Sequence, residues 1–306
     1  MTIYLYLLEN KCSICYNLFM KTFNVKKDIK TIRKLFNLSQ TQFANEVGLS
    51  RSNIARYESE TIFPHSSALE KIYSFPYKND FQLNKAKEML FIDNAGDNML
   101  LFHGAKYEIK ETIDYQHLNG KKDFGSGFYL GESFDSSASW ICEYPSGSVY
   151  GFYFKNRKEM KCVEFKVDRK WMYAILYFRG MFEEYIPSKE VLELVKQINE
   201  VDYIIAPIAD NQMYDTLTAF SLKQITDEQC LHALSANNLG SQIVLKTQKA
   251  VDNLFFIDRM YLCEKEKSFY LTNKNNMSLQ GRNKASLSIE EYRRKGKYID
   301  EIFKKR

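Results

Sequence analysis

Residues 123–130 read Asp-Phe-Gly-Ser-Gly-Phe-Tyr-Leu, and residues 101–104 before them read Leu-Phe-His-Gly. Each string places one polar or aromatic functional group at the end of an apolar, strand-like run, beside a glycine. A glycine lets a ligand approach the backbone because it has no Cβ. An imidazole can hydrogen-bond a nucleotide, and a tyrosine ring can stack on one. The two strings together indicate a nucleotide-binding site, which neither His103 nor Tyr129 would justify alone.

The sequence around these strings alternates between strand and helix patterns. Short apolar or alternating runs predict strands, and amphipathic runs between them predict helices. We therefore expect an α+β chain, in which a small all-α bundle precedes a body with a mixed, mostly antiparallel sheet. The predicted strands are Met99–Phe102, Gly127–Leu130, Val149–Phe154, Cys162–Val167, Tyr203–Ile208, Gln242–Leu245 and Leu254–Ile257, and the predicted body helices are Phe134–Glu143, Lys170–Arg179, Ser188–Ile198, Met213–Ser221 and Asp227–Ala236.

The all-α bundle is predicted upstream of residue 79, where apolar residues recur at helical spacing. Ser39 and Gln42 form a capping box, in which each side chain satisfies a free backbone N–H of the other. Gly48 then permits a tight turn, and Ser50 caps the next helix. The turn, the caps and the apolar positions agree on two short helices joined at a sharp angle.

This stretch, residues 38–58, resembles the Cro/repressor-type (XRE-like) helix-turn-helix. In that family the third helix enters the major groove and reads base edges. The resemblance implies a DNA operator as partner, bound through residues 39–57, and a homodimer on a symmetric site. A helical bundle that contacts only proteins is the alternative. The implied DNA-binding residues are Gln40, which matches a phosphate contact, and Arg51, Ser52, Asn53 and Arg56, which match the base-reading positions.

The body resembles a bacterial group within the ADP-ribosyltransferase superfamily, of the His-Tyr-Gln kind. The resemblance rests on separated motifs in the right order, namely Leu101–Gly104, Asp123–Leu130, a helix with Trp140, Ile204–Asp210 and Gln242–Thr247. We expect Trp140 itself to lie in the core, behind the sheet. It implies an ADP-ribosyltransferase-like fold and an NAD-dependent mono-ADP-ribosyltransferase, with NAD as substrate. Joined to a DNA-binding head, such an enzyme suits a toxin or defence-type effector with a small antitoxin-like protein as partner.

The resemblance also assigns roles to single residues. His103 anchors a ribose, the Gly104 backbone clamps the carboxamide, Tyr129 stacks on the nicotinamide, and Gln242 takes the third catalytic position. These roles suit the chemistry, because cleavage of NAD gives an oxocarbenium-like ribose that must be held and stabilised. The implied NAD-binding residues are His103, Gly104, Asp123, Gly125, Gly127, Phe128 and Tyr129, and the implied catalytic residues are His103, Tyr129, Gln242 and Asp210.

Gln242 departs from the usual glutamate of the superfamily. An amide can hydrogen-bond a ribose but cannot serve as a general base. Asp210 and Asp123 are candidates for the general base. Alternatively, the enzyme hydrolyses NAD, or it uses an acceptor that needs no base. Two further hypotheses stay open: a transcription regulator whose inactive domain senses NAD or another nucleotide, and an interaction protein with neither activity. The acceptor of the ADP-ribose group stays open among protein, DNA, RNA and a small molecule.

Composition narrows the class of protein. Hydrophobic residues make up 45% of the chain and charged residues 26%, as in globular domains, and no apolar run reaches the roughly 18 residues of a membrane helix. Six cysteines, of which only Cys12 and Cys15 form a CxxC, predict reduced thiols in a cytoplasm and no metal site. The basic ends and the acidic middle favour nucleic-acid or acidic partners at the ends alone.

These patterns predict the domain order. We expect an N-terminal extension over 1–25, with the true start at Met1 or Met20, a helix-turn-helix domain over 26–78, a linker over 79–97, an ADP-ribosyltransferase-like domain over 98–258 and a basic tail over 259–306. The tail should hold a loop at Lys274–Lys284 and a helix from Ser288 to the C-terminus. The apolar stripe of that helix should dock on the body or on a partner.

Overall fold

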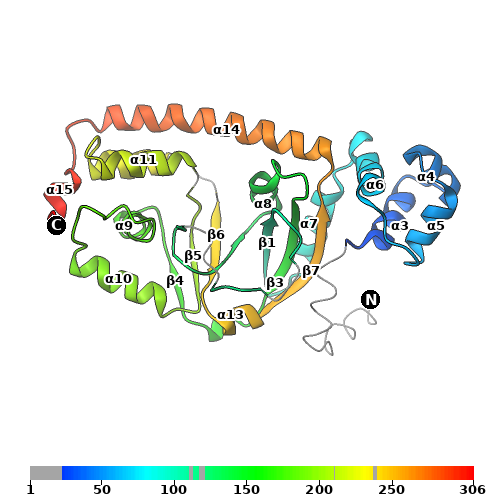
Figure 1. Cartoon of the computed structure of the whole chain (residues 1–306), viewed down its shortest axis with the longest axis horizontal. Helices are drawn as coiled ribbons and strands as arrows, with labels where there is room; N and C mark the ends of the chain where they lie inside the picture. Colours follow the sequence, from blue (N-terminus) through cyan, green and yellow to red (C-terminus); the bar gives the residue numbers. More distant parts are fainter. Residues whose placement is uncertain (1–22, 110–112, 117–120, 210, 237–239) are drawn as a thin grey trace. The chain divides into compact units, whose positions relative to one another are not determined.

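The computed structural model describes residues 23–109, 113–116, 121–209, 211–236 and 240–306 (Figure 1). The chain divides into two compact units. Unit 1 consists of Met1–Thr112, Ser133–Tyr153 and Phe255–Thr272, and unit 2 consists of Ile113–Glu132, Phe154–Leu254 and Asn273–Arg306. Each unit is therefore assembled from segments that are far apart in the sequence.

The described part of unit 1 begins with a bundle of short helices: α3 (Val25–Leu35), α4 (Gln40–Val47), α5 (Arg51–Glu58) and α6 (Ser66–Lys78). The predicted capping box is confirmed, since Ser39 Oγ accepts from the Gln42 N–H at 3.2 Å and Gln42 Oε1 accepts from the Ser39 N–H at 2.8 Å. Gly48 follows α4 with a φ of 61°, in the left-handed region that favours glycine. The helices share a core that includes Ile29, Ile32, Phe43, Val47, Ile54 and Ile72.

Segment 79–97, which the sequence predicts as a linker, contains helix α7 (Leu83–Asp93). Lys87 on this helix donates to Asp28 of α3 at 2.7 Å and to Asp258 of strand β7 (Leu254–Tyr261) at 2.9 Å. Glu70 of α6 also accepts a hydrogen bond from the Tyr261 hydroxyl at 3.1 Å. These polar bonds join the helical bundle to the strands of unit 1.

The strands of unit 1 are β1 (Met99–Ala105), β3 (Ser148–Phe154) and β7, hydrogen-bonded in that order. Helix α8 (Phe134–Ile141) packs on them through Phe134, Ala138 and Ile141. The expectation that Trp140 lies in the core is wrong, because this face of α8 leaves Trp140 on the opposite side and 61% exposed.

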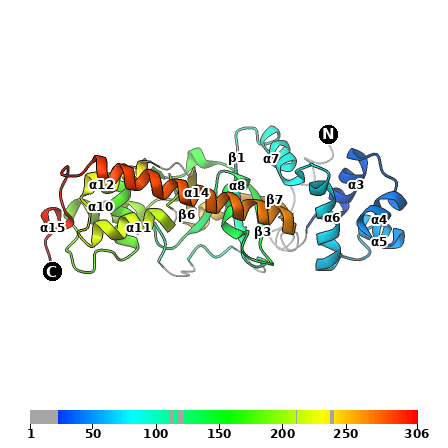
Figure 2. The same cartoon turned by 90° about the horizontal axis from the view of Figure 1, so that it is seen from above.

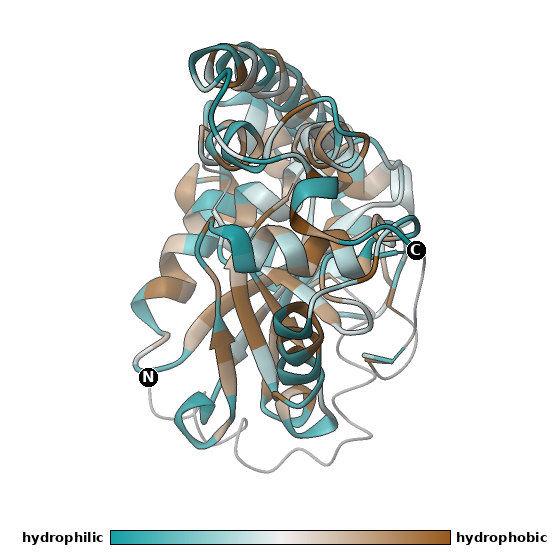
Figure 3. Cartoon of the chain, turned by 90° about the vertical axis from the view of Figure 1, so that its left-hand side faces the viewer, coloured by the Kyte–Doolittle hydropathy of each residue, from teal (hydrophilic) through white to brown (hydrophobic). Residues whose placement is uncertain are grey.

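Unit 2 contains strands β4 (Cys162–Glu164), β5 (Tyr203–Pro207), β6 (Ser241–Leu245) and β2 (Phe128–Gly131), in that order. The β4–β5 pair is parallel, and the β5–β6 and β6–β2 pairs are antiparallel. Apolar residues concentrate on the strands of the chain (Figure 3). The remaining elements of unit 2 before its C-terminal segment are α9 (Arg169–Phe178), α10 (Lys189–Asn199), α11 (Asn211–Ser221), α12 (Asp227–Ser235), α13 (Gln248–Asp252) and the 3-10 turn η1 (Arg157–Glu159). The core of unit 2 includes Trp171, Ile175, Leu217, Phe220 and Val244.

The predicted fold class is confirmed: a helical N-terminal region precedes a mixed sheet with helices, and each predicted strand and body helix overlaps an observed one. The loop expected at Lys274–Lys284 is wrong, since α14 (Glu264–Glu291) runs through it as one unbroken helix (Figure 2). This segment has no apolar stripe to signal a helix, yet it lacks proline, the residue that interrupts a helix most strongly. In the described part of the chain, no helix combines the length and the apolarity needed to cross a bilayer.

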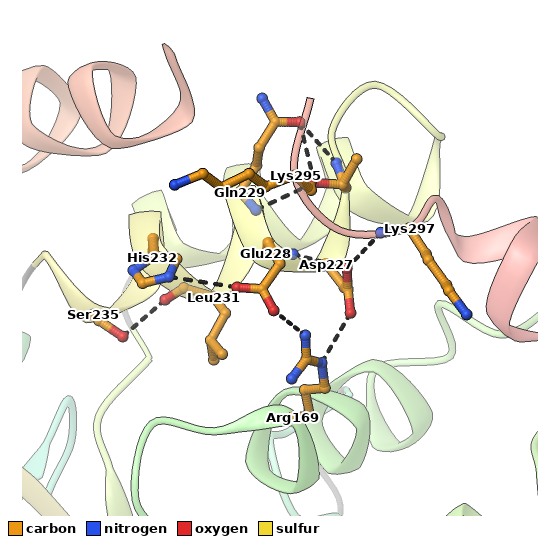
Figure 4. Close-up of polar contacts among 10 residues, drawn as sticks. Arg169, Asp227, Glu228, Gln229, Leu231, His232, Ser235, Lys295 and Lys297 are labelled. Carbon is orange, nitrogen blue, oxygen red and sulfur yellow. Dashed lines mark hydrogen bonds and ion pairs between the residues drawn. The ribbon is translucent and has the colours of Figure 1, made fainter. Parts of the chain in front are cut away.

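The C-terminal segment, residues 292–306, docks on its own unit, and it is not the continuous helix that the sequence predicts. Only the short α15 (Ile299–Ile302) is helical, after a turn at Gly296. The Asp227 N–H donates to Lys297 O at 2.9 Å, and the Lys297 N–H donates to Asp227 Oδ1 at 2.7 Å (Figure 4). Phe303 is 3% exposed and packs in the core of unit 2. Docking on the body, one of the two expectations for the apolar stripe, is therefore what the structure has.

Candidate functional site

Helix α5 carries the residues predicted to read DNA bases. The side chains of Arg51, Ser52 and Arg56 are exposed, and Asn53 is half-buried. Ser50 Oγ caps the helix by accepting from the Asn53 N–H at 3.2 Å. The helix therefore offers cationic and polar side chains on a face that the protein core does not cover, which is what a major-groove helix requires.

Gln40, the predicted phosphate contact, is half-buried and is bonded to a neighbouring helix of the bundle. Its amide donates to Glu58 Oε2 at 2.8 Å, while Arg33 Nη1 donates to Glu58 Oε1 at 2.6 Å. Glu58 is 7% exposed, so its charge needs these partners. The three residues tie α3, α4 and α5 together and fix the orientation of the recognition helix. Neither Arg33 nor Glu58 was identified from the sequence, because no local pattern shows that they pair.

In unit 2 the structure gathers Asp123, Arg179, Tyr214 and Gln242, here called the Asp123 cluster. Asp123 is 4% exposed. Its Oδ1 accepts from Arg179 Nε at 3.0 Å, from Arg179 Nη2 at 2.7 Å and from the Tyr214 hydroxyl, and its Oδ2 accepts from Gln242 Nε2 at 3.0 Å. Burial raises the pKa of Asp123, and the Arg179 charge and the Gln242 hydrogen bond act against that rise.

Tyr129 uses its hydroxyl to hold the loop before it. The hydroxyl donates to Gly125 O at 2.9 Å and accepts from the Phe124 N–H at 3.1 Å. Burial raises the pKa of this hydroxyl. Lys246, which the sequence did not single out, holds the same loop by donating to Phe124 O at 2.6 Å and to Ser126 O at 2.7 Å. Burial lowers the pKa of Lys246 to about 8.

The glycines of residues 123–130 are required by this packing. Gly125 has a φ of 70°, in the left-handed region, and a Cβ there would lie 3.1 Å from the Phe178 ring. A Cβ on Gly127 would lie 2.5 Å from Val244 Cγ1, so β2 could not pair with β6 in the same way. Phe128, which follows, is 9% exposed and buried.

Strand register places Tyr129 and Gln242 on one face of the sheet. Tyr129 pairs with Val244, and Gly131 pairs with Gln242. Directly paired residues of antiparallel strands share a face, and so do residues two apart. On the other side of Gln242, β5 presents Ala206. Gln242 is thus flanked by two small residues, which leaves space above it for polar groups from other elements.

His103 and Gly104 lie on β1 of unit 1. A Cβ on Gly104 would lie 2.6 Å from Ser137 O and 2.8 Å from Ile141 Cγ2, so the close approach of helix α8 requires glycine here. His103 is half-buried and is engaged in interactions within the structure. The requirement for Gly104 therefore has a packing reason that is independent of any ligand.

The remaining predicted residues give no site geometry. Asp210, Cys12 and Cys15 lie outside the described residues, as does most of the predicted extension 1–25. Among the described residues, no group of three or more His, Cys, Asp or Glu side chains is arranged to hold a metal ion. A hollow of about 470 Å³ in unit 2 is lined by Arg169, Tyr173, Asp227, Gly296, Lys297, Glu301 and Ile302, so it involves the C-terminal segment and no member of the Asp123 cluster.

Arg179 and Tyr214 are the functional candidates that the sequence missed. Arg179 ends the predicted helix 170–179, and its guanidinium lies 3.9 Å from the centre of the Tyr214 ring. The two residues come from different helices, so no spacing in the sequence links them to Asp123. The only signal available was the charge of Arg179 at a helix end, which is common on solvated surfaces.

Comparison with known proteins matches two parts of the chain. The family model described as "Protein of unknown function (DUF3990)" matches residues 99–256, and the model described as "Helix-turn-helix" matches residues 29–72. No curated protein and no solved structure matches the chain. The second match agrees with the exposed recognition helix and confirms a helix-turn-helix DNA-binding region. Because the first match covers more than half of the chain, the protein belongs to the DUF3990 family.

Proposed function

We propose that the protein is an NAD-dependent mono-ADP-ribosyltransferase with a DNA-binding head. The observation that carries the proposal is the pairing of β2 with β6, which sets the Tyr129 ring and the Gln242 amide on one face of unit 2 with small residues around the amide. A ring for the nicotinamide and a hydrogen-bonding group for the ribose are what cleavage of the nicotinamide–ribose bond needs. The sequence resemblance supports the same assignment and gives His103 a part in ribose binding.

In this function NAD is the substrate, and the bond between nicotinamide and ribose breaks as the ribose becomes oxocarbenium-like. The Tyr129 ring stacks on the nicotinamide while its hydroxyl stays on the loop backbone. Gln242 holds a ribose hydroxyl as positive charge develops. Asp123 serves neither as base nor as nucleophile, because Arg179, Tyr214 and Gln242 already occupy its oxygens. The acceptor therefore needs no base from this residue.

Nicotinamide release from NAD tests the enzyme assignment. We expect release by the wild type, and loss of release in Tyr129→Ala and in His103→Ala, each assayed separately. Tyr153→Ala is the matched control, since Tyr153 is also half-buried and its hydroxyl also donates to a backbone carbonyl, Phe91 O at 2.8 Å. Radiolabelled NAD with cell extract then reveals the acceptor. Equal release by wild type and Tyr129→Ala would refute the site.

A second function is favoured by one observation: Gln242 is an amide, and Asp123, the carboxylate that it contacts, is paired with Arg179. We infer from this a regulator that binds NAD without cleaving it and changes its affinity for DNA. Three measurements separate the two functions. For the regulator, calorimetry should show NAD binding, the release assay should show no nicotinamide with or without extract, and the affinity for the operator should change when NAD is added.

The DNA-binding head suits repression of the protein's own operon, as expected of a toxin or defence-type effector with a small antitoxin-like partner. Selection from a random duplex library should yield a symmetric site if the protein binds as a dimer. Arg51→Ala should weaken binding to that site by about 1–3 kcal/mol and relax specificity at one position. Lys78→Ala, at the end of α6, is a control that keeps the recognition helix intact. Equal loss in both variants would contradict base reading by Arg51.

A further inference from the structure

The orientation of the Gln242 amide is fixed by its neighbours. Its Nε2 lies 3.0 Å from Asp123 Oδ2 and 3.0 Å from Pro207 O. Both neighbours can only accept hydrogen bonds, so the amide nitrogen, which carries two hydrogens, must face them. The remaining hydrogen-bonding atom of the side chain is Oε1, and it is an acceptor.

Asp123 is itself held in one orientation. Arg179 and Tyr214 both donate to Oδ1, and this leaves Oδ2 as the oxygen that meets Gln242. A carboxylate that is 4% exposed needs such partners, because burial of an unpaired charge is very unfavourable. The guanidinium of Arg179 supplies the opposite charge at 2.7 Å. The order of bonds is therefore Arg179 and Tyr214 to Asp123, and Asp123 to the Gln242 amide.

We infer that Asp123, held by Arg179 and Tyr214, is the positioning residue that makes Gln242 present its carbonyl oxygen, so that Gln242 accepts a hydrogen bond from a hydroxyl group of the ligand. The ligand class rests on the function proposed above, in which that hydroxyl is the 2′-hydroxyl of the nicotinamide ribose. A carboxylate at position 242 would present the same kind of acceptor. The Asp123 cluster therefore makes the Gln242 amide act toward the ligand as a hydrogen-bond acceptor, as a carboxylate would.

The same geometry gives a reason for glutamine at position 242. In a Gln242→Glu variant a second carboxylate oxygen would take the place of Nε2, 3.0 Å from Asp123 Oδ2. Two carboxylates at that separation cannot both ionise readily, and one pKa rises until a proton is shared. The amide instead donates to Asp123 and avoids the repulsion. Asp123 and Gln242 therefore form a matched pair.

The test disturbs the amide orientation with Asp123→Asn. The new side-chain oxygen still accepts from Arg179, and the new side-chain nitrogen then meets Gln242 Nε2, where two donors cannot bond. Pro207 O still favours the Gln242 nitrogen and the new side-chain nitrogen favours Oε1, so no orientation satisfies both neighbours and Oε1 is no longer held toward the ligand. We expect NAD affinity to fall about 10- to 100-fold. We also expect the preference for NAD over an analogue that lacks the 2′-hydroxyl of the nicotinamide ribose to disappear.

Two variants control for a purely structural effect. Asp202→Asn alters another largely buried aspartate, which accepts from the Lys161 N–H at 2.9 Å and the Thr247 hydroxyl at 2.8 Å but does not contact Gln242. It should keep the preference for NAD. Tyr214→Phe keeps the ring, removes one donor to Asp123 and should reduce the preference only in part. Retention of the full preference in Asp123→Asn overturns the proposal.

A readout without ligand separates this proposal from the proposed function. Hydrogen exchange of the Gln242 side-chain amide, followed by NMR, should be slow in the wild type and about tenfold faster or more in Asp123→Asn. Equal exchange rates overturn the positioning role even if NAD is cleaved. NAD binding without a preference for the 2′-hydroxyl overturns the acceptor role and leaves the proposed function intact. Absence of NAD binding, with the exchange difference present, overturns the proposed function and the ligand assignment but supports the amide orientation.

Discussion

Replacing Lys87 with methionine should sharply destabilise unit 1. The Lys87 ammonium lies 2.7 Å from Asp28 Oδ2 and 2.9 Å from Asp258 Oδ2. Asp28 is 2% exposed and also accepts from the Tyr73 hydroxyl at 2.6 Å. Methionine fills a similar volume but removes the cation that both buried carboxylates contact. Removing one partner of a buried ion pair lowers the free energy of unfolding by about 3–5 kcal/mol, or roughly a 150- to 5,000-fold change in the folding equilibrium.

The pH dependence has a definite sign. Burial alone would lower the pKa of Lys87, but Asp258 and Asp28 outweigh it and raise the pKa above its ordinary value of 10.5. The stabilisation by Lys87 is therefore fully present below pH 10.5 and is lost only above it. Burial already raises the pKa of Asp258, and Lys87 acts against that rise, so the variant should raise it further. Because a protonated carboxyl needs no cation, the deficit relative to wild type should shrink as the pH falls from about 7 toward about 4.

Urea unfolding measures the loss in the free energy of unfolding of unit 1. It is monitored by pulsed hydrogen exchange of peptides from α3 and β7. Lys26→Met is the matched control, since Lys26 forms an exposed pair with Glu60 whose contribution is about 0–1 kcal/mol. Lys87→Met combined with Asp28→Asn should recover part of the loss. A loss no larger than that of Lys26→Met, or a deficit that does not change with pH, would refute the reasoning.

Three further predictions follow from single contacts. Gly104→Ala should reduce stability by about 1–3 kcal/mol through its clash with α8, whereas Gly151→Ala, whose Cβ would meet ordinary contacts at 3.6 Å or more, should change the urea midpoint much less. Burial lowers the pKa of Lys246 to about 8, below the unfolded value near 10.5, so wild-type stability should rise between these pH values, and Lys246→Met should abolish that rise in a pH series of urea titrations. Phe303→Ala should lower stability by about 3–5 kcal/mol and speed tryptic cleavage after the exposed Lys297, whose backbone N–H is held by Asp227, and an unchanged digestion rate would show that the C-terminal segment does not depend on this ring.

Local patterns were sufficient for the strands and most helices. The capping box at Ser39 and the glycine at position 48 predict the turn between α4 and α5, because both act through neighbouring backbone groups. Helix α14 could not be predicted in the same way, since its apolar residues are spread around the helix and form no stripe that periodicity could detect. The prediction that Trp140 is buried was wrong for another reason. Tryptophan favours the core by residue type, but α8 turns a different side toward the core and leaves Trp140 exposed.

The candidate site was predictable only in part. Asp123 and Gln242 stand in motifs, but their direct hydrogen bond joins residues 119 positions apart. Arg179 and Tyr214 reach Asp123 from the end of α9 and from α11, and only the packing of those helices brings them there. Lys246 follows β6 directly, yet its role depends on the path of the loop it holds. Networks of this kind are properties of topology, which a single sequence does not display.

The packing of the motif glycines changes what the motifs say about function. Gly104 is required by helix α8, and Gly127 is required by the pairing of β2 with β6. A chain that kept the fold and lost the chemistry would still need both residues, so their presence reports the fold alone. The polarity of Gln242 is different, because a buried apolar side chain would suit the two small residues beside it equally well. The polar evidence for chemistry in unit 2 therefore rests on Gln242 and on the aspartate that orients it, and variants at these two positions test that chemistry, whereas variants at the glycines test only the fold.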